Sequence, residues 1–105
     1  MIWYIGALEF VMGLLFANAV PHFVQGISGH RFQTPFASPP GIGESSALVN
    51  VLWGLANFVV GLVLFRFFGP SGSEDLPGWL CIGAGVLAMA VGLSLRFEEV
   101  RSRRR

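Results

Sequence analysis

The most informative ionisable residue is a carboxylate inside an apolar stretch. Glu9 is surrounded by hydrophobic and small residues. A charged group inside a membrane span costs about 3 kcal/mol or more, so such residues face protein and mark proton or ion pathways. Asn50 and Asn57 lie seven residues apart in a second apolar stretch and supply amides for hydrogen bonds between helices. We therefore predict an intramembrane polar site at Glu9, Asn50 and Asn57, with Asn57 or Arg66 as the partner of Glu9.

Glu9 has two interpretations that the sequence leaves open. In the first, it is a proton or cation site of a transporter or channel. In the second, it is a protonated, hydrogen-bonded strut between helices, because burial disfavours the ionised form. The asparagines are interpreted as packing contacts, since interhelical amide hydrogen bonds in membranes contribute about 0.6 kcal/mol on average.

A second group of polar residues lies at the end of the first apolar stretch and in the segment that follows it. His22, His30 and Arg31 are candidates for contacts with a partner or ligand. The two histidines lie eight residues apart in a Gly- and Pro-rich segment without nearby thiols, which matches no usual metal spacing. We therefore predict no metal site and no cofactor. The sequence also lacks the Gly-x-Ser-x-Gly, His-Glu-x-x-His, Walker and dinucleotide motifs, so we predict no catalytic residue and expect a non-enzyme.

Three apolar stretches must position these residues. The chain has 105 residues, of which 53% are hydrophobic and 12% charged. Each stretch is about 20 residues long, which spans the roughly 30 Å hydrocarbon core as a helix. Backbone groups in lipid must be hydrogen-bonded within the protein, so each stretch is predicted to be a helix. The expected fold class is an all-α membrane protein in one domain: three antiparallel transmembrane helices over residues 2–24, 46–68 and 76–96, a long ordered loop over 25–45, an outer loop over 69–75, and a basic tail over 97–105.

The charged residues predict the orientation. The arginines after residue 95 form the main basic cluster, so the positive-inside rule places the C-terminus in the cytoplasm. Three crossings then place the N-terminus outside, the loop over 25–45 inside, and Glu74 and Asp75 outside. Arg66 is the one discordant charge, close enough to the outer end to snorkel. The expected location is a bacterial inner membrane.

Each predicted span carries two glycines seven residues apart. Seven residues are nearly two helical turns, so both members of a pair lie on one face. In lipid there is no hydrophobic driving force between helices. Small residues let helix backbones approach closely, so that van der Waals packing can hold the helices together. These positions are predicted to form the seams between helices: Gly6 and Gly13, Gly54 and Gly61, and Gly85 and Gly92.

The segment over 25–45 is too long for a tight connection and too apolar for a solvated linker. Phenylalanines among Gly and Pro residues indicate an ordered loop, either on the membrane face or re-entrant. We expect helix 46–68 to take Ser45 or Ser46 as its N-cap.

Three helices enclose little space, so we expect the bilayer and a homo-oligomer or larger membrane complex as partners. The formal net charge of +1 does not favour nucleic acid. The leading hypothesis is a non-enzymatic accessory, assembly or partner-binding subunit. The alternative is an oligomeric small transporter or channel that uses Glu9.

Overall fold

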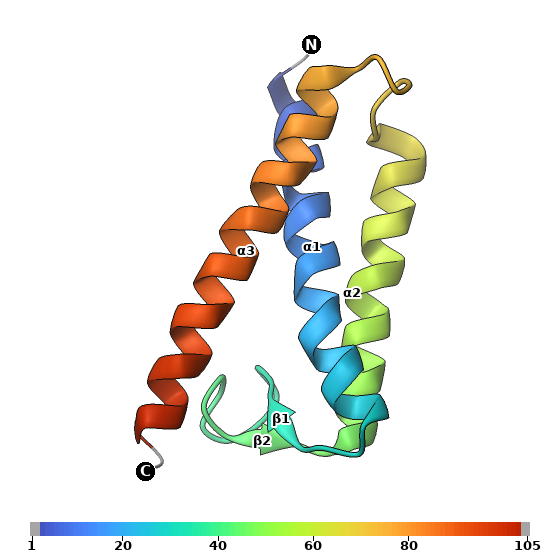
Figure 1. The fold of residues 1–105 in the computed structure, drawn as a ribbon. Coiled ribbons are helices and arrows are strands. Elements are labelled where there is room, and N and C mark those ends of the chain that lie inside the picture. Colours follow the sequence, from blue (N-terminus) through green and yellow to red (C-terminus); the bar gives the residue numbers. More distant parts are fainter. Residues whose placement is uncertain (1–2, 104–105) are drawn as a thin grey trace.

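The computed structural model describes residues 3–103, which form three long helices and one small sheet (Figure 1). All three helices are long enough and apolar enough to cross a membrane. The prediction of a multi-pass, largely helical membrane protein is therefore confirmed at this level. Ile2 of the first predicted span, and Arg104 and Arg105 of the predicted tail, lie outside the described residues. In chain order the elements are α1 (Trp3–Ile27), β1 (Phe32–Gln33), β2 (Glu44–Ser45), α2 (Ala47–Phe68) and α3 (Leu76–Arg103).

Helix α1 continues three residues beyond the predicted end at residue 24. It passes through Pro21, although proline lacks the N–H that an interior helical residue donates. The helix ends at Ile27, and Gly29, in the turn that follows, has a φ of 79° in the left-handed region that favours glycine. The Gly29 N–H donates to the Gly26 carbonyl (3.0 Å), and His30 N–H donates to the Gln25 carbonyl (2.9 Å). These bonds close the last turn and start the loop.

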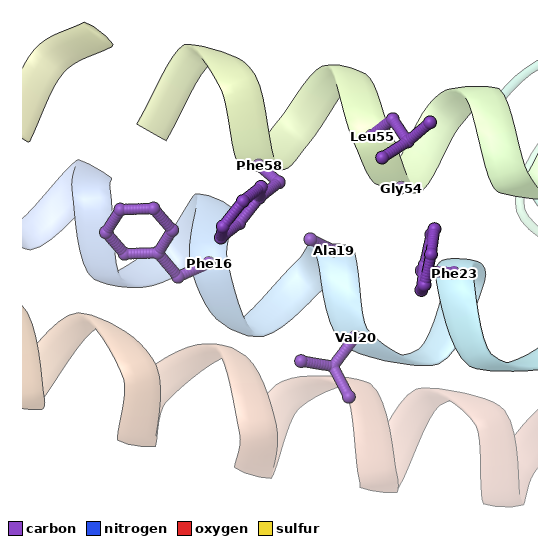
Figure 2. A pocket seen from close by; sticks show the side chains of 7 residues that line it. All are labelled: Phe16, Ala19, Val20, Phe23, Gly54, Leu55 and Phe58. Atoms are coloured by element: carbon purple, nitrogen blue, oxygen red, sulfur yellow. The ribbon is translucent and has the colours of Figure 1, made fainter. Parts of the chain in front are cut away.

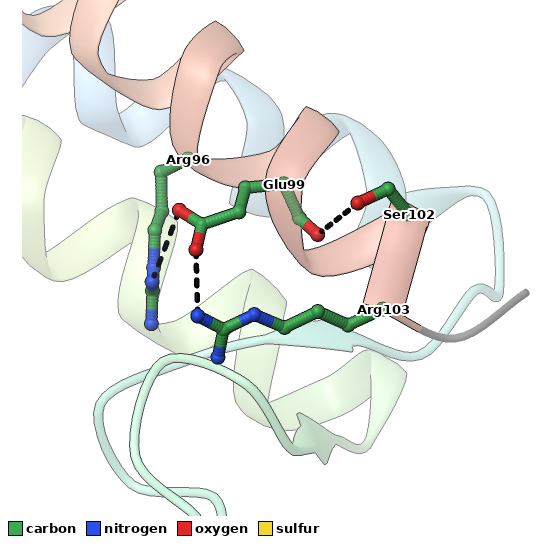
Figure 3. A network of polar contacts seen from close by, with 4 residues as sticks. All are labelled: Arg96, Glu99, Ser102 and Arg103. Atoms are coloured by element: carbon green, nitrogen blue, oxygen red, sulfur yellow. Dashed lines mark hydrogen bonds and ion pairs between the residues drawn. The ribbon is translucent and has the colours of Figure 1, made fainter.

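Residues 97–103 of the predicted basic tail are helical, because α3 runs without a break to Arg103. Glu99 lies between two arginines one turn away on either side (Figure 3). Its carboxylate is 3.7 Å from Arg96 Nη1 and 2.7 Å from Arg103 Nη2. Such i,i+3 and i,i+4 pairs stabilise exposed helices, and basic residues in the last turn favour the helix dipole.

Helix α2 begins where the sequence predicted a capping serine. Ser46 is the N-cap, and its side chain accepts a hydrogen bond from Val49 N–H (3.2 Å). At the other end of the molecule Asp75 caps α3, because its carboxylate accepts from Gly78 N–H (3.2 Å) and from Ser71 N–H (3.1 Å). Side-chain caps therefore start both helices.

Helix α1 lies between the other two and packs against both (Figure 1). In the described part of the chain, α2 and α3 scarcely touch each other. The two seams on α1 therefore hold the molecule together. That the helices cross a bilayer in alternating directions remains a prediction.

The seam between α1 and α3 is a contact of two backbones. A β-carbon built on Gly13 would lie 2.9 Å from Gly85 Cα and 2.7 Å from Val86 N. One built on Gly85 would collide with the Phe10 carbonyl oxygen. Only glycine permits this approach, and van der Waals packing is the main attraction between helices in lipid.

The seam between α1 and α2 is also built on small residues. A β-carbon on Gly54 would lie 2.8 Å from Phe23 N and 3.0 Å from the Ala19 carbonyl oxygen. At Gly61 the nearest atoms belong instead to the Phe16 ring, at 2.7 Å. Gly6 is buried as well.

Gly92 departs from the predicted seams. It lies one heptad from Gly85 and on the same face of α3, yet it is exposed, and no atom of another segment among residues 3–103 lies within 4 Å of its β-carbon position. Toward its C-terminal end, α3 diverges from α1 (Figure 1). The seam prediction is therefore wrong at Gly92, because a shared face brings two residues into contact only while the helix axes stay close.

The two glycines of α2 should differ in their tolerance of alanine. Gly54→Ala pushes against the α1 backbone, whereas Gly61→Ala pushes against one aromatic ring that can rotate. We expect Gly54→Ala to cost about 2 kcal/mol of unfolding free energy, in the range for overpacked cores, and Gly61→Ala about half of that. Denaturant unfolding in detergent micelles measures both. Equal losses would show that the Phe16 ring is as fixed as the backbone.

Candidate functional site

The loop between α1 and α2 lies at one end of the molecule, which we call the loop end. At its centre lies the side-chain amide of Asn50, which is fully buried. Its Nδ2 donates to the carbonyls of Phe32 (3.1 Å), Ser45 (3.3 Å) and Ser46 (3.0 Å). Its Oδ1 lies 2.9 Å from His22 Nδ1. One side chain of α2 thus connects both loop strands to helix α1.

The bonds of Asn50 determine the tautomer of His22. Carbonyl oxygens only accept, so the Asn50 nitrogen must face them and its oxygen must face His22. His22 Nδ1 therefore carries a proton and donates it to Asn50. In the neutral ring, Nε2 is then a hydrogen-bond acceptor. Edge-on rings surround the imidazole, with centroids 5.6 Å (Phe32), 6.4 Å (Trp53) and 6.4 Å (Phe97) away.

The loop is attached to the helices by aromatic contacts as well. The Phe32 ring packs on Phe97 of α3 with a centroid distance of 4.6 Å, and the Phe36 ring packs on Trp53 of α2 at 5.0 Å. Within the loop, β1 and β2 pair in antiparallel register, Phe32 opposite Ser45. The loop therefore contacts all three helices and has a defined conformation.

A cavity of about 380 Å³ lies between the loop and the helices. Two of its polar lining residues come from the loop and from α2: Gln33 is buried, and Trp53 Nε1 is buried without a hydrogen-bond partner in the part of the chain that the structure describes. Arg96, whose side chain is 42% exposed, also lines it. The lining consists of Asn18, His22, Gln33, Thr34, Pro35, Pro40, Gly41, Trp53, Leu93, Arg96 and Phe97.

His30 and Arg31 do not belong to this cavity. Both side chains are exposed on the outer side of the loop. His30 Nδ1 lies 2.8 Å from Gln25 Oε1, and Arg31 Nη2 donates to the Glu44 carbonyl (3.2 Å). The structure thus separates the three predicted loop residues, with His22 inside and the other two on the surface.

Glu9 lies far from both asparagines, so the predicted three-residue polar site is not assembled. Asn57 Oδ1 accepts from Asn18 Nδ2 (3.0 Å), and Asn57 Nδ2 donates to the Trp53 carbonyl (2.8 Å). Asn18 is nine residues from Glu9, which places it on the opposite face of α1 and about 13 Å along the helix axis. The expected partnership between Glu9 and Asn57 is therefore wrong, and so is that with Arg66, which lies over the Phe67 ring (5.7 Å).

Glu9 instead lies against the start of α3. It is fully buried, and neither carboxylate oxygen has a hydrogen-bond partner among residues 3–103. A β-carbon at Gly78 would lie 2.5 Å from Glu9 Oε2 and 2.9 Å from Asp75 Oδ2, so these oxygens are at most 5.4 Å apart, the sum of the two distances. Two carboxyl groups thus share the end of the molecule opposite the loop.

A second cavity, of about 440 Å³, lies along the seam of α1 and α2 and has an apolar lining (Figure 2). Phe16 and Phe58 form one end, with ring centroids 5.9 Å apart. It offers no polar group for recognition and suits only an apolar occupant. The lining residues are Phe16, Ala19, Val20, Phe23, Gly54, Leu55 and Phe58.

Several residues that line the loop-end cavity were not predicted from the sequence, among them Gln33, Trp53, Arg96 and Phe97. A signal for Trp53 was present, because Asn50, Trp53 and Asn57 follow i, i+3, i+7 spacing and share one face of α2. On α1, Asn18 and His22 lie one turn apart in the same way, and these two faces meet in the structure. For Gln33, Arg96 and Phe97 no local pattern exists, because the loop brings them together.

Searches against known protein families, curated proteins and solved structures return no match to this chain. Within residues 3–103, no three His, Cys, Asp or Glu side chains gather closely enough to hold a metal ion. The loop-end cavity can bind a group that accepts hydrogen bonds from Trp53 and Arg96 and donates one to His22.

Proposed function

We propose that this chain is a non-enzymatic, partner-binding accessory subunit of a bacterial inner membrane. In this proposal the three helices cross the bilayer antiparallel, the N-terminus is outside, and the loop and C-terminus are cytoplasmic. The positive-inside rule supports this orientation, because Arg31, Arg101 and Arg103 lie at the loop end and Glu74 and Asp75 at the other.

The observation that carries the proposal is the fixed conformation of the loop. Ordering one residue costs about 1–2 kcal/mol in backbone entropy, so a connection of this length is held only by specific contacts. Asn50, the Phe32–Phe97 contact and the Thr34–Ser45 hydroxyl pair supply them. A surface that is ordered in advance binds at a lower entropic cost. The loop presents His30 and Arg31 on such a surface.

The surroundings of His22 favour binding over catalysis. A catalytic histidine activates a hydroxyl or thiol and is oriented by a third group. Here Nδ1 bonds to an amide, and no hydroxyl or thiol bonds to the ring among the residues that the structure describes. The imidazole is a structural connection between α1 and α2.

The partner in this proposal is a membrane protein, either a second copy or a subunit of a larger complex. Three helices leave most apolar side chains of α2 and α3 facing outward, where lipid or another helix covers them. The cytoplasmic surface at His30 and Arg31 adds a polar contact outside the membrane.

Site-specific photocrosslinking in intact membranes tests the proposal. A photoreactive residue in place of Arg31 should give one discrete protein adduct, whereas the same residue in place of lipid-facing Val63 should give none or a different one. An adduct of twice the chain mass identifies a second copy, and any other mass identifies a larger complex. Absence of a protein adduct at position 31 and at its neighbour His30 would refute the proposal.

A second candidate function, an oligomeric transporter or channel, rests on Glu9. A buried carboxyl group without a partner, beside a second carboxylate, is typical of intramembrane proton and cation sites. Proteoliposomes containing the protein should then show proton or cation flux, which Glu9→Gln abolishes. The matched control Glu74→Gln, at an exposed position, should retain it. If the parent protein shows no flux, Glu9 is a packing residue and this candidate fails.

A further inference from the structure

A wedge opens between α1 and α3 on the loop side of their contact. The two backbones touch at Gly13 and Gly85, while Gly92, on the same face one heptad later, meets no other segment of residues 3–103. The side chains around the opening are apolar, with Leu93 half-buried and Val20 exposed. The wedge is therefore closed towards the N-terminal end of α1 and open laterally.

The loop closes the other end of this wedge. Phe97 of α3 packs on Phe32, and the loop backbone at Gly41 comes close to Arg96, with a β-carbon there lying 3.8 Å from Arg96 Nη2. The 380 Å³ cavity lies in this closed corner and includes Leu93 from the wedge. The apolar wedge between α1 and α3 is thus continuous with the polar lining of the cavity.

The polar end favours an anion. Arg96 has five N–H donors, and its closest carboxylate contact, to Glu99, is a long one at 3.7 Å. Trp53 Nε1 adds a buried donor without a protein partner among the described residues, and the buried Gln33 amide also lines the cavity. Guanidinium and N–H groups together are the usual recognition set for phosphate.

The depth of Arg96 identifies the source of the anion. It directly follows Leu95, at the end of the apolar part of α3, which is the level of the lipid phosphates. Basic pockets between transmembrane helices on the cytoplasmic side bind the headgroups of anionic lipids. A lipid also matches this arrangement, because its headgroup is polar like the cavity at Arg96 and its acyl chains are apolar like the wedge.

We propose that this cavity binds one anionic phospholipid, with its phosphate at Arg96 and an acyl chain in the wedge between α1 and α3. The inference concerns a surface separate from His30 and Arg31 and does not depend on partner binding there. The lipid would fill the space that α3 leaves open and thereby stabilise its divergent orientation.

Native mass spectrometry in a non-ionic detergent, with titrated phosphatidylglycerol or phosphatidylcholine, tests this inference. The parent protein should retain one phosphatidylglycerol at concentrations where it retains no phosphatidylcholine. Arg96→Gln should weaken phosphatidylglycerol binding about fivefold or more, the effect of one arginine at a membrane surface. The control Arg101→Gln removes the same charge from an exposed position of α3 that is not among the lining residues of the cavity, and should change binding less than twofold.

A second variant tests the acyl chain separately. Gly92→Phe fills the wedge while keeping the Arg96 guanidinium and should also weaken phosphatidylglycerol binding, whereas Ala90→Phe, at another exposed position of α3, should not. Equal binding of both lipids, or equal effects of the two arginine variants, would overturn the proposal. Displacement of the lipid by an equal concentration of inorganic phosphate would assign the site to free phosphate instead.

Discussion

Alanine at Gly85 should separate α3 from α1. A β-carbon there would collide with the Phe10 carbonyl and lie 3.0 Å from Gly13 Cα and from Leu14 N, all backbone atoms that no side-chain rotation can move. Overpacking that side chains can absorb costs about 1–3 kcal/mol, so we expect a loss of roughly 3 kcal/mol or more in unfolding free energy. Thermal or denaturant unfolding in detergent, followed by circular dichroism, measures this loss.

Gly92→Ala is the matched control for this substitution. It adds the same methyl group to the same face of the same helix, where no other segment of residues 3–103 lies within 4 Å. Its stability should be unchanged or higher, because alanine favours the helix over glycine. If Gly85→Ala and Gly92→Ala behave alike, the contact between α1 and α3 lies elsewhere.

Leucine at Asn50 should release the loop from the helices. The substitution removes the hydrogen bonds to the Phe32, Ser45 and Ser46 carbonyls and to His22. A buried polar group left unpaired costs about 1–3 kcal/mol, so we expect a loss of roughly 3 kcal/mol or more. Hydrogen exchange over residues 28–45 should accelerate strongly, which mass spectrometry of peptic peptides detects.

Asn57→Leu provides the comparison within the same helix. Asn57 loses one interhelical bond, to Asn18, and a bond to its own helix at Trp53. The average worth of such interhelical bonds, about 0.6 kcal/mol, predicts a small change in stability. Exchange in the loop should stay as in the parent protein. Rapid loop exchange in Asn57→Leu would mean that the loop responds to general loosening of α2 rather than to loss of the Asn50 bonds.

A lipid bound in the wedge would affect the stabilities measured for the glycine variants and for the asparagine variants. A lipid bound at Arg96 would contribute to the measured stability in proportion to its concentration, since a ligand that binds only the folded state stabilises it. Both variant pairs are therefore compared in one detergent with and without phosphatidylglycerol. The difference between Gly85→Ala and Gly92→Ala should persist in both conditions.

The sequence by itself determined the number and the approximate ends of the helices. Long apolar stretches have only one way to satisfy their backbone groups in lipid, so length and hydrophobicity suffice. A serine cap for α2, at Ser45 or Ser46, also followed from local residue types, and the structure has Ser46 in that position. The helical continuation of α3 to Arg103 was missed, although the spacing of Arg96, Glu99 and Arg103 contained the signal.

The tertiary structure alone decided which polar residues meet. The sequence allowed a contact between Glu9 and Asn57. In the structure, the rotation of α1 about its axis instead places Glu9 near Asp75 and Asn18 against Asn57. Gly85 and Gly92 share a face, yet only the tilt of α3 determines that the first packs and the second does not. Helix tilt and rotation depend on all contacts together, including those of the loop, whereas helix formation depends only on neighbouring residues and the surrounding lipid.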